Sequence, residues 1–319
     1  MTIPTRSFER AGLEVGAIGL GCMGMSWAYG APERDDERSV AVIRRALELG
    51  VTLLDTADMY GPFTNEQLVG RALEGRRDEA VVATKCGLVV NAAETFEIGR
   101  NGRPEHVKSA ADASLRRLQT DWLDLYQLHR IDPDVPLEET WGAMSELVDQ
   151  GKVRALGLSE VSVEELERAE AVHPVASVQS ELSLWTRGPL DEVLPWCEAH
   201  GAAFLPFAPL GRGFLTGKVT PQSFGDDDFR ARNPRFTEEA MGRNDAIADE
   251  VRAVAARLDA TAAQVALAWL LLRSSGVIPI PGTKRLSYLE ENAAAAELEL
   301  DAEALAALDS LPDPVGERY

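Results

Sequence analysis

The stretch Val51-Thr52-Leu53-Leu54-Asp55-Thr56-Ala57-Asp58-Met59-Tyr60-Gly61 opens with an apolar run and then meets two carboxylates and a phenol within six positions. The run suits one buried strand that ends at Asp55, with Tyr60 on the loop just beyond. Because charge is costly to bury for packing alone, a buried strand that ends in ionisable groups usually ends at a functional site. The alternative is a strand followed by a solvated loop, with Asp58 and Gly61 as turn residues. Taken by itself, the stretch fits both interpretations.

Composition narrows the class of protein. The chain has 319 residues, with 45% hydrophobic and 26% charged, as in soluble globular proteins. The formal net charge of −20 argues against binding to nucleic acid or to an anionic membrane. The widely spaced Cys22, Cys86 and Cys197 offer neither a disulfide framework nor metal-ligand spacing. With no signal-peptide core at the first residues and no apolar run long enough to span a bilayer, we expect a cytoplasmic protein.

Short apolar runs alternate with amphipathic stretches after a hairpin expected over residues 3–15. The expected strands are 17–20, 52–54, 80–83, 122–127, 155–158, 177–178, 203–207 and 277–280, and the clearest expected helices are 34–49, 138–150, 245–258 and 262–273. Strands that do not alternate in polarity, each followed by a helix, indicate a parallel sheet covered on both faces.

Eight strand–helix units can be counted, and eight is the number that closes a (β/α)8 TIM barrel. An open doubly wound sheet is the alternative at this chain length. The connections favour the barrel, because the long ones, 21–33, 86–103 and 210–244, all follow strands, where barrel enzymes build their sites. We therefore predict one α/β domain over residues 1–319, a TIM barrel with an N-terminal β-hairpin and long βα loops.

Ionisable side chains stand at the ends of consecutive expected strands: Asp55 at the second, Lys85 at the third and His129 at the fourth, with Tyr60 just past the second. A closed barrel brings these ends to one mouth. Tyrosine is a weak acid, with a pKa near ~10, and a nearby lysine cation makes its proton easier to donate. Aspartate would keep the lysine charged, and histidine would orient a substrate carbonyl.

The sequence offers no activated serine or cysteine and no metal cluster, so a hydride from a nicotinamide cofactor fits as the nucleophile. Each of the four residues has a structural explanation when taken alone. Their placement on consecutive strand ends favours the functional interpretation.

These motifs resemble those of the aldo-keto reductases, specifically the bacterial and plant branch that opens with Gly-Leu-Gly-Cys-Met-Gly-Met, here residues 19–25. The resemblance covers residues 19–292 and rests on LDTADMYG at 54–61, ATK at 83–85, QLHR at 127–130, GKVRALGLSE at 151–160, PLGRGFLTG at 209–217 and IPGTKR at 280–285. It implies a (β/α)8 barrel that reduces small-molecule aldehydes and ketones with NADPH. It also implies that Asp55, Tyr60, Lys85 and His129 are the catalytic residues.

The resemblance further implies how NADP(H) is bound. Ser159, Glu160 and Gln179 would contact the nicotinamide carboxamide, although the commonest family residue after the serine is asparagine, and a carboxylate cannot donate. Phe207 would stack under the nicotinamide, and the connection 210–244 would close over the pyrophosphate. The other implied cofactor contacts are Gly21, Met23, Asp55, Pro209, Leu210, Gly211, Gly213, Gly282, Thr283, Lys284, Tyr288, Glu291 and Asn292.

Thr283, Lys284 and Arg285 place three donors in a row at the expected start of the last helix, where phosphate is favoured. In so acidic a chain they indicate a 2′-phosphate, hence NADPH rather than NADH. The alternative is an ordinary exposed Lys-Arg pair. Tyr288 stands where the family often has arginine or glutamine, and it would either stack on the adenine or face away.

The substrate is expected to lie against Trp27 and Tyr29, beside Tyr60 and His129, with Phe63 as another candidate wall. The acidic run 226–228 is expected at a solvated edge of the long loop rather than in a metal site.

The same sequence admits other functions. The run 19–24 matches G-x-G-x-x-G, but a loop follows it instead of the helix that a Rossmann fingerprint needs. A redox-sensing subunit of the same fold, and a barrel enzyme that uses Lys85 as a Schiff base, are the alternatives to a reductase. An oligomer is compatible with the sequence.

Overall fold

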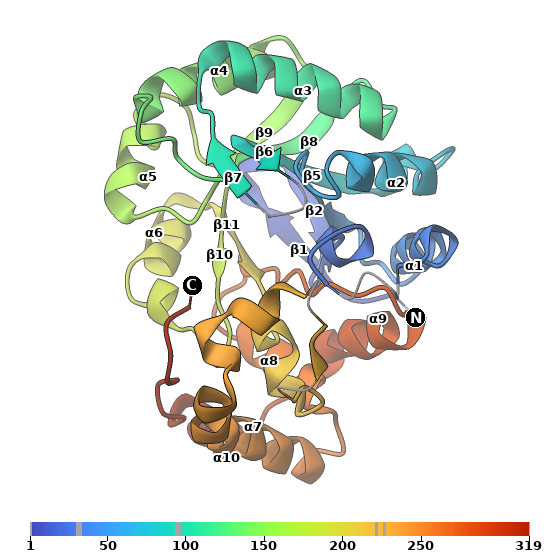
Figure 1. Ribbon diagram of the computed structural model, residues 1–319, viewed down its shortest axis with the longest axis vertical. Coiled ribbons are helices and arrows are strands. Elements are labelled where there is room, and N and C mark those ends of the chain that lie inside the picture. The colour runs from blue at the N-terminus through green and yellow to red at the C-terminus, as the bar shows by residue number, and fades with distance from the viewer. Residues whose placement is uncertain (1, 30–33, 93–96, 221–222, 226–227, 319) are drawn as a thin grey trace.

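A sheet of seven parallel strands forms the centre of the protein, in a computed structural model that describes residues 2–29, 34–92, 97–220, 223–225 and 228–318. The strands are hydrogen-bonded in the order β11-β10-β9-β8-β5-β4-β3 (Figure 1). Their bounds are β3 Leu20–Gly21, β4 Leu53–Asp55, β5 Val81–Cys86, β8 Leu123–Leu128, β9 Val153–Ser159, β10 Ser177–Glu181 and β11 Ala203–Phe207.

The segment 277–282 closes this sheet into a barrel between β11 and β3. The amides of Ile278 and Ile280 donate to carbonyls of β11, at 2.9 and 3.0 Å. The carbonyls of Pro279 and Pro281 accept from amides beside and within β3, at 2.9 and 3.2 Å. Because proline has no amide hydrogen, that side carries only part of a ladder, and the segment is not a regular strand. The predicted TIM barrel is confirmed, and the open sheet is excluded.

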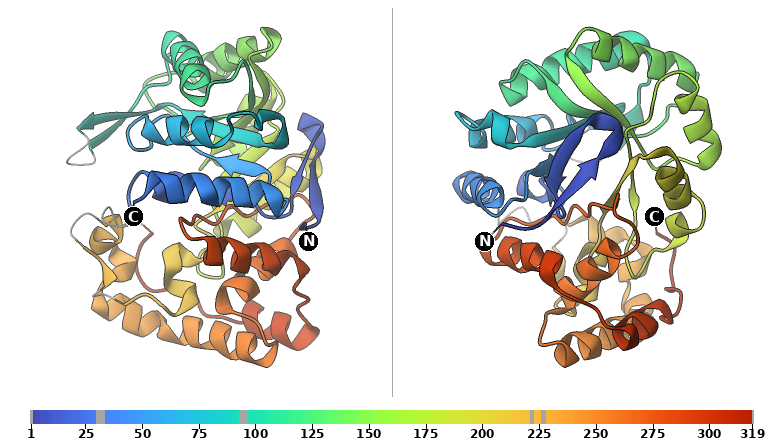
Figure 2. Two further views of the ribbon diagram at one scale, coloured as in Figure 1. Left: turned by 90° about the vertical axis from the view of Figure 1, so that its right-hand side faces the viewer. Right: turned by 180° about the vertical axis from the view of Figure 1, so that it is seen from behind.

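Helices cover the outside of the barrel (Figures 1 and 2). Their bounds are α1 Asp36–Glu48, α2 Thr64–Ala72, α3 Pro104–Leu118, α4 Leu137–Asp149, α5 Val163–Glu170, α6 Val193–His200, α7 Glu238–Arg257, α8 Ala262–Leu271, α9 Leu286–Ala294 and α10 Ala302–Asp309. Local capping sets several of their starts; at α5, Ser162 and Glu165 form a capping box. On α4, the apolar face with Trp141, Met144 and Leu147 is buried, as its spacing predicts.

The predicted N-terminal hairpin is present as β1 Thr5–Phe8 and β2 Leu13–Gly16, and it lies across the amino-terminal end of the barrel (Figure 2). Phe8 is buried among the small and branched side chains inside the barrel. Arg6 donates to three main-chain carbonyls of residues 271–277, each at 2.6 Å. The hairpin therefore fastens the segment that closes the barrel.

Two connections contain more regular structure than the sequence predicts. In 86–103, β6 Leu88–Ala92 and β7 Glu97–Arg100 form an antiparallel hairpin that projects from the barrel (Figure 2). The connection after β11 contains the 3-10 helices η6 Gly211–Thr216, η8 Phe229–Arg232 and η9 Pro234–Phe236. Helix α7 begins at Glu238 rather than at residue 245, because Thr237 caps it by accepting from an amide at 3.2 Å.

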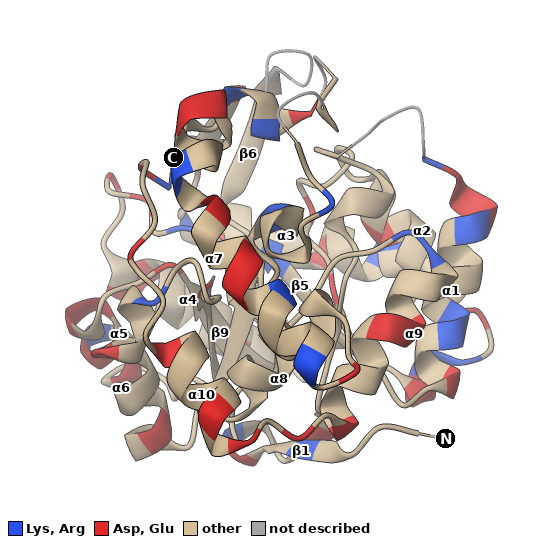
Figure 3. Cartoon of the chain, turned by 90° about the horizontal axis from the view of Figure 1, so that it is seen from below, with Lys and Arg blue, Asp and Glu red and all other residues tan. Residues whose placement is uncertain are grey.

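Acidic and basic side chains are interspersed on the outer helices (Figure 3). Within the described ranges, no single helix is long and apolar enough to cross a bilayer; α7 and α8 would pass by length and composition only as a pair, which is bent by 92°. The apolar side chains of α8 are buried inside the protein, apart from Leu271 at its last position, which is partly buried.

Candidate active site

Lys85, near the end of β5, is fully buried, and its ammonium is held by three oxygens. Nζ donates to Asp55 Oδ1 at 2.6 Å, to the Thr56 carbonyl at 2.7 Å and to the Tyr60 hydroxyl at 3.3 Å. Asp55 ends the neighbouring strand β4, and Tyr60 lies on the loop that follows it. Three of the four predicted catalytic residues are therefore in contact, and the lysine joins them.

Burial and charge act in opposite directions on this group. Burial lowers the pKa of Lys85, but Asp55 and then Tyr60 raise it, and the net pKa lies above the ordinary value. Burial raises the pKa of Tyr60 most, Lys85 lowers it, and the net pKa also lies above the ordinary value. Lys85 does favour the phenolate, as the sequence predicts, but burial outweighs it. At neutral pH the lysine is charged and the phenol keeps its proton.

His129 directly follows β8, and its ring meets that of Tyr60 edge-on, with 5.9 Å between the centroids. Burial first, and then the charges of Lys85 and Arg130, hold the pKa of His129 well below the ordinary value. The imidazole is therefore neutral. Within the described chain, its Nδ1 has no hydrogen-bond partner. A neutral ring carries one N–H, which suits it to hydrogen-bond a carbonyl oxygen.

The second oxygen of Asp55 is held by two amide side chains. Gln179 Nε2 donates to Asp55 Oδ2 at 2.7 Å, and Gln127 Nε2 lies 3.4 Å from the same oxygen. Gln179 also lines the cavity described below. Because its amide nitrogen donates to Asp55, its amide oxygen can accept a hydrogen bond from a bound molecule.

A cavity of about 1170 Å³ opens at the carboxyl ends of the strands. It runs from Tyr60 and His129 to the start of α9. Most of the predicted cofactor and substrate residues line it, namely Gly21, Met23, Trp27, Tyr29, Asp55, Tyr60, His129, Ser159, Gln179, Phe207, Pro209, Leu210, Gly213, Gly282, Thr283, Lys284, Tyr288, Glu291 and Asn292. The barrel thus gathers residues from all along the chain into one elongated site.

The α9 end of the cavity is basic. The guanidinium of Arg285 and the ammonium of Lys218 lie 5.5 and 4.9 Å from the centre of the Tyr288 ring. Lys284 Nζ donates to the main-chain carbonyl of Tyr29 at 3.2 Å, which ties the start of α9 to the first loop. Arg285 precedes the first turn of α9 and provides no side-chain cap, so the amides of that turn can receive an anion.

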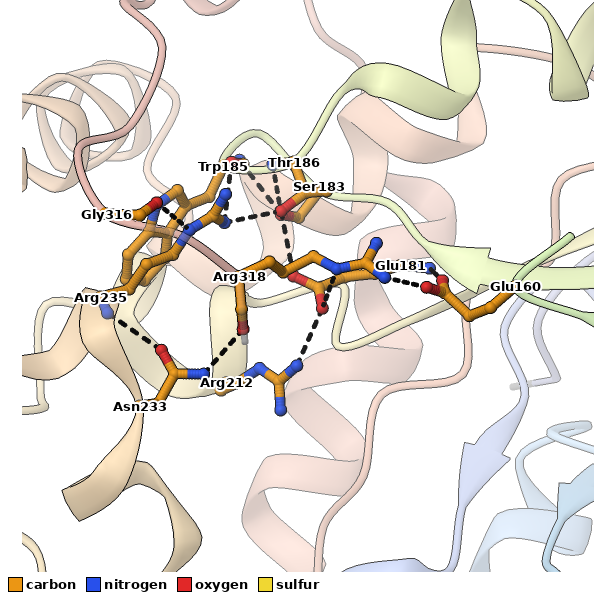
Figure 4. A network of polar contacts seen from close by, with 10 residues as sticks. All are labelled: Glu160, Glu181, Ser183, Trp185, Thr186, Arg212, Asn233, Arg235, Gly316 and Arg318. Atoms are coloured by element: carbon orange, nitrogen blue, oxygen red, sulfur yellow. Dashed lines mark hydrogen bonds and ion pairs between the residues drawn. The ribbon is translucent and has the colours of Figure 1, made fainter. Parts of the chain in front are cut away.

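Glu160 and Gly211 do not line the cavity in the described chain. The Glu160 carboxylate pairs with Arg318 and accepts from the amide of Glu181 at 2.9 Å, as Figure 4 shows. Gly211 adopts φ 56°, and an added Cβ would meet Trp185 at 2.6 Å. Gly211 is therefore required for packing against the tryptophan, whereas Gly213 lines the cavity.

Three further residues named in the sequence analysis can now be placed. Asp58 is buried, which excludes the alternative of a solvated turn residue; burial, and then the charge of Glu66, raises its pKa to about 8. Phe63 is half exposed outside the cavity, with its ring 5.0 Å from the Arg117 guanidinium. Asp228 is buried and pairs with Arg230 at 2.6 Å, so it is not a solvated edge. Residues 226 and 227 of that acidic run lie outside the described residues.

The structure adds residues that sequence reasoning missed. Arg130 lines the cavity, and its Nη1 donates to the His129 carbonyl at 2.5 Å and to Ser159 Oγ at 3.0 Å. Leu88 and Ile98 of the β6–β7 hairpin are apolar parts of the wall. Arg130 is adjacent to His129 in the motif QLHR, so its position was readable, whereas the hairpin had no sequence signal. Among the described residues, no group of three or more His, Cys, Asp or Glu side chains could hold a metal ion.

Asp55→Asn tests the ion pair between Asp55 and the buried Lys85. The variant leaves the Lys85 charge buried without its counter-ion, so the free energy of unfolding should fall by about 3–5 kcal/mol near neutral pH. Urea denaturation measures it. Asp249→Asn, which removes the partner of exposed Arg252, should change it by no more than about 1 kcal/mol. An equally small change for Asp55→Asn would show that the buried Lys85 does not depend on Asp55 as its counter-ion.

Comparison with known proteins agrees with this geometry. The model of the aldo/keto reductase family matches residues 17–313. The chain is 39% identical to "Probable aldo-keto reductase 1" of Glycine max over 312 residues, which cover 97% of this chain and 89% of that protein.

Solved structures are similar as well. A glycerol dehydrogenase from Gluconobacter oxydans matches with a TM-score of 0.88 and 31% identity over 99% of this chain and 98% of the other. An aldo/keto reductase from Klebsiella pneumoniae, solved in complex with NADP and acetate, matches with a TM-score of 0.72 and 31% identity over 99% of both chains. With its barrel, its site and these relatives, the chain belongs to the aldo/keto reductase family.

Proposed function

We propose that the protein reduces aldehydes and ketones to alcohols with NADPH, and that Tyr60 is the proton donor. The observation that carries the proposal is the position of Lys85 Nζ, between Asp55 Oδ1 at 2.6 Å and the Tyr60 hydroxyl at 3.3 Å, beside a cavity that Tyr60 and His129 line. Family membership supports an oxidoreductase acting on carbonyls.

In this mechanism His129 donates a hydrogen bond to the substrate oxygen and places the carbonyl carbon toward the nicotinamide. The bound cofactor supplies the hydride, which adds to that carbon and leaves the electron pair of the C=O bond on oxygen. Tyr60 gives its phenolic proton to that oxygen, and Lys85, held charged by Asp55, stabilises the phenolate that forms. The same groups run the reverse reaction, the oxidation of an alcohol.

The cavity fits a dinucleotide. It extends from Tyr60 to the basic start of α9. The side chains along it offer hydrogen-bond donors and acceptors for an amide and for phosphates. We assign the nicotinamide to Ser159, Gln179 and Phe207, with Asp55, Gly21 and Met23 beside it. The pyrophosphate is assigned to Pro209, Leu210 and Gly213, and the adenosine to Gly282, Thr283, Lys284, Tyr288, Glu291 and Asn292. Glu160 and Gly211 are left out of this set.

The proposed substrate lies between the nicotinamide and an apolar wall. Trp27 is buried, with its ring 6.2 Å from that of Tyr60, and Tyr29 packs edge-on against Phe229 at 5.1 Å. Aromatic surface on this side favours carbonyl compounds that carry an apolar group. The Klebsiella structure with NADP and acetate supports a site that holds a dinucleotide and a small oxygen-bearing molecule together.

Tyr60→Phe tests the assigned proton donor. Removing the hydroxyl should lower NADPH-dependent aldehyde reduction by about 10²–10⁴-fold, because general acid catalysis contributes that much. NADPH affinity, measured by fluorescence titration, should persist. Tyr126→Phe is the matched control: its hydroxyl donates to the Val107 carbonyl at 2.9 Å, away from the cavity, so turnover should be kept. Undiminished turnover of Tyr60→Phe would end the proposal.

The pH profile of reduction follows from the same charges. The reaction needs the protonated phenol, so kcat/KM should fall as pH rises through the pKa of Tyr60, which lies above the ordinary value of 10.0. The lowered pKa of His129 means that no inflection should appear near 6.5. Initial rates from about pH 5 to about pH 11 at fixed ionic strength measure both features. Activity that climbs through an inflection near 6.5 would show that His129 titrates and would contradict the assignment.

Arg285→Ala tests the choice of dinucleotide. If Arg285 pairs with the 2′-phosphate, the Kd for NADPH should rise about tenfold, as expected for a lost charge-assisted hydrogen bond. The Kd for NADH, which lacks that phosphate, should stay the same and serves as the internal control. Equal weakening of both would indicate a general effect on the fold of this corner instead.

A further inference from the structure

The C-terminal residues 315–318, here called the tail, lie against both the barrel rim and the segment that follows β11. Side chains of Asn233, Arg235 and Asn244 donate to main-chain carbonyls of the tail, at 2.8, 3.2 and 2.9 Å. The first two belong to residues 210–220, 223–225 and 228–237, here together called the covering segment. Figure 4 shows the tail beside this segment, with the Arg318 side chain turned to the strand ends. The tail thus touches two parts of the site at once.

Arg318 completes an alternating chain of charges. Its guanidinium pairs with Glu160, and its Nε lies 3.7 Å from Glu181 Oε2. Arg212 Nη2 lies 2.9 Å from the same Glu181 oxygen. The Glu160 and Glu181 side chains are only 13% and 4% exposed. Two carboxylates buried side by side repel each other unless cations lie between them, and here two guanidinium groups do.

This row of alternating charges connects the residues next to the proposed nicotinamide site with the covering segment. Glu160 directly follows Ser159 and adopts φ 56°, a left-handed conformation that a non-glycine residue holds only with support from its surroundings. Glu181 lies on β10, two positions beyond Gln179. On the other side, Arg212 belongs to η6, between cavity-lining Leu210 and Gly213. Neutralising the two carboxylates therefore holds the ends of β9 and β10 and the covering segment together.

We propose that Arg318 is a positioning residue that slows the release of the dinucleotide, by tying the covering segment to the rim through Glu160 and Glu181. The tail also holds the Glu160 carboxylate away from the nicotinamide carboxamide. Glu160 therefore does not make the contact that the family's usual asparagine would make at this position. The inference rests on the proposed function, because it requires a dinucleotide under the covering segment.

The test is the rate constant of NADPH dissociation, measured by stopped-flow fluorescence with excess NADP as the competitor. Arg318→Ala should raise it about tenfold, because a charge-assisted contact to a buried carboxylate is lost. Arg318→Lys keeps the charge without the planar fork and should give a smaller rise. Hydride transfer in a single turnover, started from the NADPH complex, should keep its rate, because the Lys85 corner is untouched. A purely structural role would lower thermal stability without this selective change.

Two further variants sharpen the test. Arg257→Ala removes an arginine whose partner, Asp301, is half exposed, and it should leave dissociation unchanged. In a Glu160→Gln background the side-chain oxygen of residue 160 can still accept from the main-chain amide of Glu181. Residue 160 then carries no negative charge for Arg318 to neutralise. There, Arg318→Ala should raise the rate by less than about threefold.

Equal dissociation rates for wild type and Arg318→Ala would overturn the inference, as would the same rise in both backgrounds. If Arg318→Ala does not fold, Arg318→Lys is compared in the wild-type and Glu160→Gln backgrounds instead. The rise in dissociation rate should again be smaller in the Glu160→Gln background. A wild-type protein that does not bind NADPH would overturn the proposed function itself, whereas binding with unchanged dissociation would overturn only the role of Arg318.

Discussion

A lysine buried without access to water, Lys85, is the constraint on which the rest of the site depends. An ammonium group in the protein interior is tolerated only with a counter-ion and further oxygens around it. Asp55, the Thr56 carbonyl and the Tyr60 hydroxyl are those oxygens, and all come from the strand beside β5 and the loop after it. The need to satisfy one cation therefore fixes the position of the phenol that faces the cavity.

Barrel closure turns this local arrangement into a site. The strands are parallel and adjacent, so Asp55, Lys85, His129, Ser159 and Gln179 reach the same rim from successive strands. The last segment, 277–282, joins β11 to β3 with a ladder thinned by two prolines, and it brings the basic start of α9 to the far end of the cavity. Closure of the barrel thus brings Tyr60 and His129 to one end of the cavity and the basic start of α9 to the other.

Buried carboxylates recur around the rim, and in the described chain several are matched with arginine. Glu181 meets Arg212, Asp228 meets Arg230, and Glu160 meets Arg318. The pairs of Glu181 with Arg212 and of Glu160 with Arg318 join segments that are far apart in the sequence, whereas Asp228 and Arg230 belong to the same segment. In a chain with a net charge of −20, these three arginines each neutralise a carboxylate that has little contact with solvent.

The sequence by itself determined the barrel, because hydrophobic period, turn residues and the lengths of the connections are local properties. It also singled out Asp55, Tyr60 and Lys85 as candidates from the chemistry at the strand ends, and the structure brings these three into contact. The N-terminal hairpin and the buried face of α4 were readable for the same reason. The hairpin β6–β7 and the early start of α7 were not, since a capping threonine and short strands with exposed faces leave weak patterns. Motif position also suggested a cofactor role for Glu160. Only the tertiary structure decided that its carboxylate faces Arg318, a residue 158 positions away, because pairing of buried charges depends on which distant segments meet.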